Sequence, residues 1–180
     1  MSPKAGHPAN RHSILHDRDL YRKPALRVKL RLMNIQTTAP VLLRERDNDI
    51  AILLLNREQA RNSLSEALLI ALSEAFADIA ADKTIRAVVL AANGPAFCAG
   101  HDLKELSARR SDADGGRAYF KHIMTICSAM MQAIVNLPQP VIAAVRGVAS
   151  AAGCQLVASC DLAVAASAAK CATPGVDSGL

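Results

Sequence analysis

The sequence has no tryptophan, and only 3% of its residues are aromatic. Because 51% of the residues are nevertheless hydrophobic, a core must be built from Ala, Leu, Val and Ile. No apolar run reaches the roughly 18 residues that a membrane-spanning helix needs, so we expect a soluble protein. The 180 residues suffice for one sizeable core, which predicts one domain.

The five cysteines, at positions 98, 127, 154, 160 and 171, form no Cys-x-x-Cys pair and have no zinc-finger spacing to histidine. These absences argue against the common zinc and redox motifs. Most of the cysteines lie among Ala, Val and Leu, so we expect buried, reduced thiols in a cytosol-like compartment. A Ser-His-Asp set, a metal cluster and a Gly-x-x-x-x-Gly-Lys phosphate loop are also missing from the sequence.

The excess of positive charge is confined to the start of the chain. Residues 1–32 hold eight Lys/Arg against two Asp, whereas residues 33–180 hold 13 Lys/Arg against 14 Asp/Glu. This basic extension lacks the apolar stretch of a secretory signal. It is open to three interpretations: a transit peptide, a nucleic-acid arm, or sequence upstream of a true start at Met33. We favour the last and expect disorder, since the remainder shows no basic cluster with aromatics for nucleic acid.

Apolar patterning in the remainder predicts alternating strands and helices. A helix with its N-cap at Ser63 and Glu66 as the capping-box partner is predicted by helical spacing of apolar residues up to residue 79. Further helices are expected over 103–110, 117–135 and 150–159, and strands over 41–45, 50–55, 86–92, 141–145, 161–166 and 169–174. The strand over 86–92 is continuous in apolar residues, which is typical of burial on both faces. The alternation indicates one α/β domain with parallel strands.

Two loops rich in small residues follow predicted strands: "FCAGHD" (97–102) and "GVASAAGCQ" (147–155). In α/β sheets, ligands bind beyond the carboxyl ends of strands. Each loop also runs into a helix start, where backbone N–H groups are left unpaired. Two such loops at adjacent strand ends would aim two N–H donors at one oxygen, as in an oxyanion hole. The alternative is that the small residues only let a helix pack closely on a sheet.

Four phrases carry a resemblance that covers residues 38–180: "NREQARNSLS", "AFCAGHDLKEL", "PQPVIAAVRGVASAAGCQLVASCDLAVA" and "ATPGVDSGL". In their order and spacing they resemble the enoyl-CoA hydratase/isomerase (crotonase) superfamily. The resemblance implies a crotonase-like (ClpP/crotonase) α/β spiral of β-β-α units. It also implies that the helical region closing the pocket and packing the trimer in family members is lacking here, so that 38–180 is an incomplete acyl-CoA-binding domain.

The resemblance also implies the site. Family members hold the thioester oxygen of an acyl-CoA between two backbone N–H groups, which fall here on His101 and Ala152. The imidazole of His101 would either reach the acyl group or only line the wall. Positions that would contact CoA are Ala60, Arg61, His101, Asp102, Leu103, Lys104 and Ala152, with Arg57, Arg61 and Lys104 offering positive charge to the phosphates. We expect Asp102 to cap the helix starting at Leu103 rather than to perform chemistry.

The two glutamates that handle water and protons in the hydratases of the family are absent. Their positions correspond to Gln155 and Gly175, and neither residue exchanges a proton near neutral pH. The resemblance therefore implies an acyl-CoA-binding protein of fatty-acid metabolism in which true hydratase activity is not expected. A non-catalytic pseudoenzyme and a non-functional truncated fragment are the alternatives. Asp177 is a weak candidate base, and His122 is expected to pack on its helix.

The expected partners follow from the same resemblance. The ligand would be an acyl-CoA thioester, with coenzyme A as part of the substrate and no other cofactor or metal. A homotrimer or a dimer of trimers is implied, whereas nucleic acid and membranes are not. The protein would be cytoplasmic in a bacterium and mitochondrial in a eukaryote, where the basic segment would serve as the targeting sequence.

Overall fold

The computed structural model describes residues 39–175, so the basic extension 1–32 and Asp177 lie outside the described residues. The first described element is a hairpin of β1 (Leu42–Asp47) and β2 (Ile50–Leu55), which pair antiparallel. Asn48 takes a positive φ of 55° in the two-residue turn, a conformation that asparagine tolerates better than most residues. The two predicted strands are confirmed.

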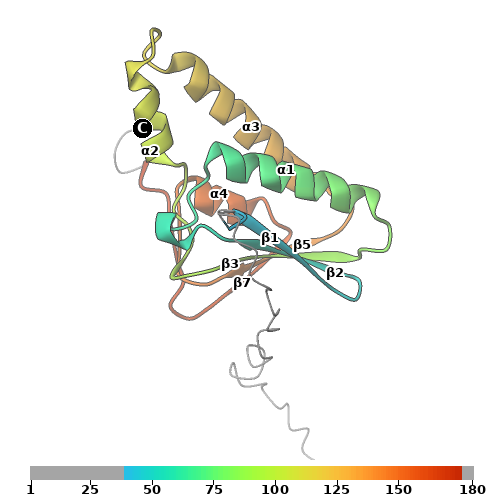
Figure 1. The fold of residues 1–180 in the computed structure, drawn as a ribbon. Helices are drawn as coiled ribbons and strands as arrows, with labels where there is room; N and C mark the ends of the chain where they lie inside the picture. The colour runs from blue at the N-terminus through green and yellow to red at the C-terminus, as the bar shows by residue number, and fades with distance from the viewer. Residues whose placement is uncertain (1–38, 176–180) are drawn as a thin grey trace, which may run out of the picture. The chain divides into compact units, whose positions relative to one another are not determined.

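The hairpin opens a five-stranded sheet whose order is β1-β2-β3-β5-β7. Beyond the hairpin all neighbours are parallel: β3 (Ala87–Ala92), β5 (Val141–Val145) and β7 (Leu162–Ala165). The alternation of strands and helices therefore gives the expected parallel sheet. The prediction that β3 is buried on both faces is wrong for one face, whose residues are only half-buried. Residues 87–90 alternate between half-buried and buried, and Ala91 and Ala92 are both half-buried. The two long helices lie over one face of the sheet, which accounts for the alternation (Figure 1).

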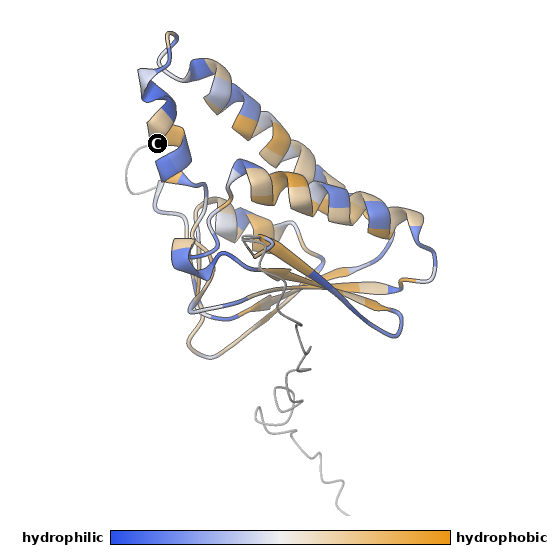
Figure 2. Ribbon diagram, in the orientation of Figure 1, coloured by the Kyte–Doolittle hydropathy of each residue, from blue (hydrophilic) through white to orange (hydrophobic). Residues whose placement is uncertain are grey.

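Two long helices pack together over one face of this sheet, α1 (Glu66–Ala81) and α3 (Arg117–Val135) (Figure 1). Their inward positions and the strands beneath them are mainly apolar (Figure 2). The bounds of α3 match the prediction. The predicted start of α1 at Ser63 is wrong by two residues, because Ser65 is the N-cap and its side chain accepts from the Leu68 N–H at 3.2 Å.

A second, three-stranded parallel sheet was not predicted. It consists of β4 (Ala96–Cys98), β6 (Val148–Ser150) and β8 (Lys170–Ala172), in the order β4-β6-β8. Strands of three residues are too short for an alternating pattern to show. β4 overlaps the start of one segment interpreted as a loop, and β6 lies inside the other, whereas β8 confirms the predicted strand over 169–174. This small sheet holds those two segments side by side.

Short helical elements complete the described part. The 3₁₀ turn η1 (Glu58–Ala60) follows β2, and α2 (Leu103–Ala108) continues into η2 (Arg109–Ser111). The helix α4 (Ala152–Ala158) follows β6 directly. None of the described helices is long and apolar enough to cross a membrane.

The strand β7 lies at one edge of the five-stranded sheet, and its side chains are exposed. All four of its residues are exposed, Leu162 by 63% and Val164 by 62%. The prediction of buried cysteines holds for Cys98 and Cys127, but it is wrong for Cys171, which is exposed on β8. The apolar environment around Cys171 in the sequence is therefore not a buried environment in the fold.

Candidate functional site

The first of the two predicted segments joins β4 to α2, and Gly100 turns it with a φ of +95°. Leu64 forms a parallel bridge to the residue after this turn, His101. In that bridge the Leu64 N–H donates to the Gly100 carbonyl at 2.8 Å, and the Leu64 carbonyl accepts from the Asp102 N–H at 3.1 Å. The N–H of His101 itself takes no part in the bridge, and it donates to no acceptor within residues 39–175.

The second segment joins β6 to α4 through Ala151, whose φ of 50° and ψ of −121° are strained for a residue with a side chain. The Ala151 N–H donates to the Ala172 carbonyl at 2.9 Å, while the Ala151 carbonyl accepts from Cys154 and Gln155. No side chain caps α4. The N–H of its first residue, Ala152, therefore has no acceptor in the described part of the chain.

The two segments touch. A Cβ placed on Gly100 would lie 3.1 Å from the Ser150 carbonyl oxygen and 3.5 Å from the backbone nitrogen of Ala152. One placed on Gly153 would lie 2.2 Å from the Cys98 carbonyl oxygen. Both positions need glycine for this approach. Because β4 and β6 pair in parallel, the unpaired N–H groups of His101 and Ala152 lie at neighbouring strand ends.

The imidazole of His101 is half-buried, and its Nδ1 is fully buried with no hydrogen-bond partner in the described chain. Burial lowers the pKa of His101, because desolvation disfavours the charged ring. The side chain is therefore neutral at pH 7, with one nitrogen able to accept a proton.

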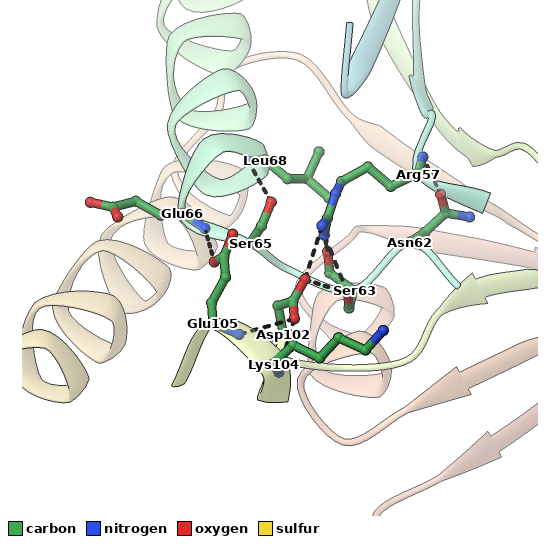
Figure 3. Close-up of polar contacts among 9 residues, drawn as sticks. All are labelled: Arg57, Asn62, Ser63, Ser65, Glu66, Leu68, Asp102, Lys104 and Glu105. Carbon is green, nitrogen blue, oxygen red and sulfur yellow. Dashed lines mark hydrogen bonds and ion pairs between the residues drawn. The ribbon is translucent and has the colours of Figure 1, made fainter. Parts of the chain in front are cut away.

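A polar network fixes the segment behind His101, with Asp102 at its centre (Figure 3). One carboxylate oxygen pairs with the Arg57 guanidinium at 2.9 Å and accepts from the Ser63 hydroxyl at 3.2 Å. The other accepts from the backbone N–H groups of Lys104 and Glu105. The prediction that Asp102 caps α2 is confirmed. Both charged side chains are largely buried, with exposures of 16% for Arg57 and 9% for Asp102.

The pKa of Asp102 lies below its ordinary value. Burial alone would raise this pKa, but the hydrogen bonds from Arg57, from the Glu105 N–H and from Ser63 outweigh it. Arg57 also donates to the Ser63 carbonyl at 2.6 Å. Its guanidinium is thus occupied within the protein, which argues against the expected role of Arg57 toward phosphates.

The expected CoA-contacting positions border the first segment. Ala60 is half-buried at the end of η1, and Arg61 is exposed with a φ of 50°. The Arg61 carbonyl accepts from the Ala99 N–H at 3.0 Å, which ties this turn to the end of β4. Leu103 is 72% exposed, and Lys104 is exposed beside it. Among residues 39–175 neither Arg61 nor Lys104 forms an ion pair.

A groove of about 620 Å³ begins at Leu103 and runs between α2 and the start of α3. Its walls are mixed, with apolar side chains and two arginines: Leu103, Leu106, Phe120, Arg110 and Arg117 among them. The groove therefore starts two residues after His101 in the sequence and offers a partly apolar surface.

The positions of the two missing glutamates lack any acid in the structure as well. Gln155 is exposed on the first turn of α4, and Gly175 is the last described residue, three positions after β8. His122 lies on the exposed side of α3, where its Nε2 is 2.8 Å from a carboxylate oxygen of Glu66. This fits the expected packing role. No group of three or more potential ligands in the described residues could hold a metal ion.

The sequence resemblance placed Asn62 in the segment 60–62 that borders CoA, but it did not predict the structural role of this residue. Its side chain is fully buried and donates to the carbonyls of Asn93 and Ala96 at 2.8 Å each, and it accepts from the Arg57 N–H. Asn62 therefore joins the turn after β2 to the start of β4. The sequence carried only a weak signal for this role, namely that asparagine adopts a positive φ more readily than most residues. In the structure, Asn62 has a φ of 52° directly after the positive φ of Arg61.

The chain is similar to proteins of known family and structure. Residues 45–180 match the family model described as "Enoyl-CoA hydratase/isomerase". A solved enoyl-CoA hydratase of Mycobacterium smegmatis is 54% identical, with a TM-score of 0.71 over 78% of this chain and 53% of that one. Human enoyl-CoA hydratase domain-containing protein 3 is 41% identical in its solved structure, with a TM-score of 0.70 over the same shares.

The mouse mitochondrial protein of the latter name is 44% identical over 142 residues, which are 78% of this chain and 46% of that protein. The chain thus spans about half the length of the curated relatives it matches. The expected crotonase-type α/β fold is confirmed by the solved neighbours. By the family match and by this fold, the chain belongs to the enoyl-CoA hydratase/isomerase family.

Proposed function

We propose that this protein binds acyl-CoA thioesters and polarises the thioester carbonyl between the backbone N–H groups of His101 and Ala152. The observation that carries the proposal is the contact between the two segments, in which Gly100 lies against the start of α4. Both N–H groups lack an acceptor in the described chain. A carbonyl oxygen placed between them would satisfy both donors at once.

Two fixed donors suit a carbonyl that gains negative charge. Backbone N–H groups held by glycines and helix starts need no reorganisation as the charge develops, and one such donor is worth about 3–4 kcal/mol in comparable sites. The first turn of a helix adds a partial positive charge, here from α4. The donors are main-chain groups, so the side chain at position 101 does not affect the oxyanion contact itself.

The remainder of the ligand would follow the surface around the first segment. The exposed cations of Arg61 and Lys104 would face the phosphates, with Ala60, Asp102 and Leu103 shaping the backbone path beside them. The acyl chain would enter the groove that begins at Leu103. Arg57 is left out of this proposal, since its guanidinium is bound to Ser63 and Asp102.

Hydration of an enoyl-CoA is not part of the proposal. Paired acids that serve as general acid and base contribute about 10²–10⁴ each to the rate, and Gln155 and Gly175 supply neither. We therefore propose binding and carbonyl polarisation without hydratase turnover, which is the behaviour of a pseudoenzyme.

A second candidate function is enolate-type chemistry that uses His101 as the base. One observation favours it: the Nδ1 atom of His101 is buried without a partner, on a ring whose lowered pKa keeps it neutral. A neutral imidazole next to an oxyanion site is able to take a proton from the carbon beside the thioester. This candidate predicts exchange of that proton with solvent deuterium, and His101→Gln should abolish the exchange while leaving binding intact.

Assembly and location remain proposals. A homotrimer or a dimer of trimers is the assembly implied by the family, for a chain that covers about half of its relatives. The mouse relative is named as mitochondrial, whereas the Mycobacterium relative is bacterial. A eukaryotic source would place this protein in mitochondria, and a bacterial one in the cytoplasm.

The test is calorimetric titration with butyryl-CoA, together with a hydration assay on crotonyl-CoA. We expect binding and no measurable hydration. Gly100→Ala adds a methyl group 3.1 Å from the Ser150 carbonyl oxygen at a positive φ, so affinity should fall about tenfold or more. Gly115→Ala is the matched control for folding, because φ is also positive there but nothing lies within 4 Å. Its affinity is not used as a control, since Gly115 lines the groove proposed for the acyl chain.

Three results separate the alternatives. Absence of binding by the folded protein would reject the proposal and support a non-functional fragment. Strong hydration by the unaltered chain would reject the pseudoenzyme. If the Gln155→Glu, Gly175→Glu double variant is folded and binds but gains no hydration, the placement of the acid positions is wrong.

A further inference from the structure

Two cysteine side chains meet beside Ala152. Cys154 is the third residue of α4, Cys171 is the middle residue of β8, and the two side chains lie close enough to interact. Backbone contacts fix this approach. β8 pairs with β6 so that Cys171 lies opposite Ala149, and the Ala151 N–H donates to the carbonyl of Ala172 at 2.9 Å. The turn at Ala151 then carries Cys154 back over β8.

Solvent access distinguishes this pair from the other cysteines. Cys171 is exposed and Cys154 is half-buried, whereas Cys98 and Cys127 are both buried in the core. Cys160 is half-buried, but its thiol donates to the Leu156 carbonyl at 3.3 Å within its own helix turn. Among the described residues, Cys154 and Cys171 are therefore the neighbouring cysteines that include an exposed member.

We propose that Cys154 and Cys171 form a disulfide when the protein meets a dissolved hydroperoxide, which makes this pair an oxidation site next to the Ala152 amide. In the first step the Cys171 thiolate attacks the peroxide O–O bond, gives a sulfenic acid and releases hydroxide. In the second step the Cys154 sulfur attacks the Cys171 sulfur and expels water. With hydrogen peroxide, two thiols and one peroxide yield one disulfide and two waters.

The order of the two steps follows from the environment of each thiol. Burial raises the pKa of Cys154, and the neighbouring Cys171 thiol raises it further, so Cys154 is held as the neutral thiol. The thiolate is the species that reacts with peroxides, and exposure decides which cysteine meets them. Cys171 therefore reacts first and Cys154 resolves the sulfenic acid. The resulting link ties β8 to the first turn of α4, two residues from Ala152.

The test on the unaltered chain counts and maps thiols after treatment with hydrogen peroxide. We expect the free thiols of the denatured protein to fall from five to three, and dithiothreitol to restore all five. Trypsin should then release the peptide 147–170, which holds Cys154, linked to the peptide that begins at Cys171. This readout needs no acyl-CoA and is independent of the proposed function.

Three serine variants assign the partners. Cys154→Ser should leave Cys171 as a sulfenic acid that dimedone traps, with no linked peptide. Cys171→Ser should prevent the disulfide and protect Cys154 from dimedone. Cys160→Ser is the matched control: serine keeps the hydrogen bond to Leu156, and the linked peptide should form as in the unaltered chain.

Three outcomes would overturn the proposal. The first is full retention of five free thiols in folded protein after peroxide treatment. The second is a linked peptide in Cys154→Ser, which would assign the bond to Cys160. The third is a bond between two chains, seen as a dimer on a non-reducing gel, in place of the bond within one chain.

Discussion

The two segments that meet at the site are held by different forces. The His101 segment is fixed by polar side chains, since Asp102 caps α2 and pairs with a nearly buried Arg57. The Ala152 segment has no side-chain cap, and Gly153 packs α4 directly against the backbone of β4. One unpaired amide is thus positioned by charge and hydrogen bonds, and the other by steric fit.

This difference decides how each half responds to change. A polar network weakens in steps as single hydrogen bonds are lost, and its strength depends on pH. A close contact between two backbones does not weaken in steps. A single methyl group added between them clashes at once and forces the two segments apart. The two halves should therefore fail differently, which three substitutions can show.

The largest effect is expected from Gly153→Ala on the steric side. The new Cβ would lie 2.2 Å from the Cys98 carbonyl oxygen and 2.8 Å from its carbonyl carbon, so α4 and β4 would have to separate. We expect the free energy of unfolding to fall by more than about 3 kcal/mol, or the protein not to fold. Urea unfolding followed by circular dichroism measures this. If Gly153→Ala lowers the free energy of unfolding no more than Gly115→Ala does, the Ala152 segment is not held by steric fit, and the contrast with the His101 segment is wrong.

A smaller effect is expected from Asp102→Asn on the polar side. Asparagine still caps a helix, but it leaves the Arg57 guanidinium largely buried without its counter-charge, which costs about 2–3 kcal/mol.

The same variant tests the pH dependence of the polar half. The folded-state pKa of Asp102 lies below its unfolded value, so the stabilisation is fully present above the unfolded pKa, about 4, and is lost as pH falls through the folded pKa. Unfolding measured from pH 7 to pH 3 should show a shallower decline in Asp102→Asn than in the unaltered chain. Equal slopes would mean that Asp102 does not carry the effect.

The smallest effect is expected from Arg57→Lys. Lysine keeps the charge and is able to reach Asp102, but it lacks the forked guanidinium that also serves the Ser63 carbonyl. We expect the free energy of unfolding to fall by about 1 kcal/mol, the typical net worth of one hydrogen bond. Thermal unfolding would detect this, and a loss as large as that of Asp102→Asn would show that geometry matters here more than charge.

Helix α3 and strands β2, β3 and β5 were predictable because each has enough residues for its apolar period to show. The cap at Asp102 was predictable because it is a local contact. The start of α1 was not, because Ser63 and Ser65 are equally good caps in sequence and only tertiary contacts assign Ser63 to Asp102. The engagement of Arg57 was missed for the same reason, since its partner lies 45 positions away.

The sequence by itself determined the α/β alternation, the family resemblance and the absence of acids at Gln155 and Gly175, since these depend only on the order and identity of residues. Only the tertiary structure decided that β4, β6 and β8 form a second sheet, because three-residue strands are stable through pairing and not through local preference. That sheet brings Gly100 against Ala152 and Cys171 against Cys154. Contacts between distant segments depend on how the whole chain packs, so the site and its neighbouring thiol pair became visible only in the fold.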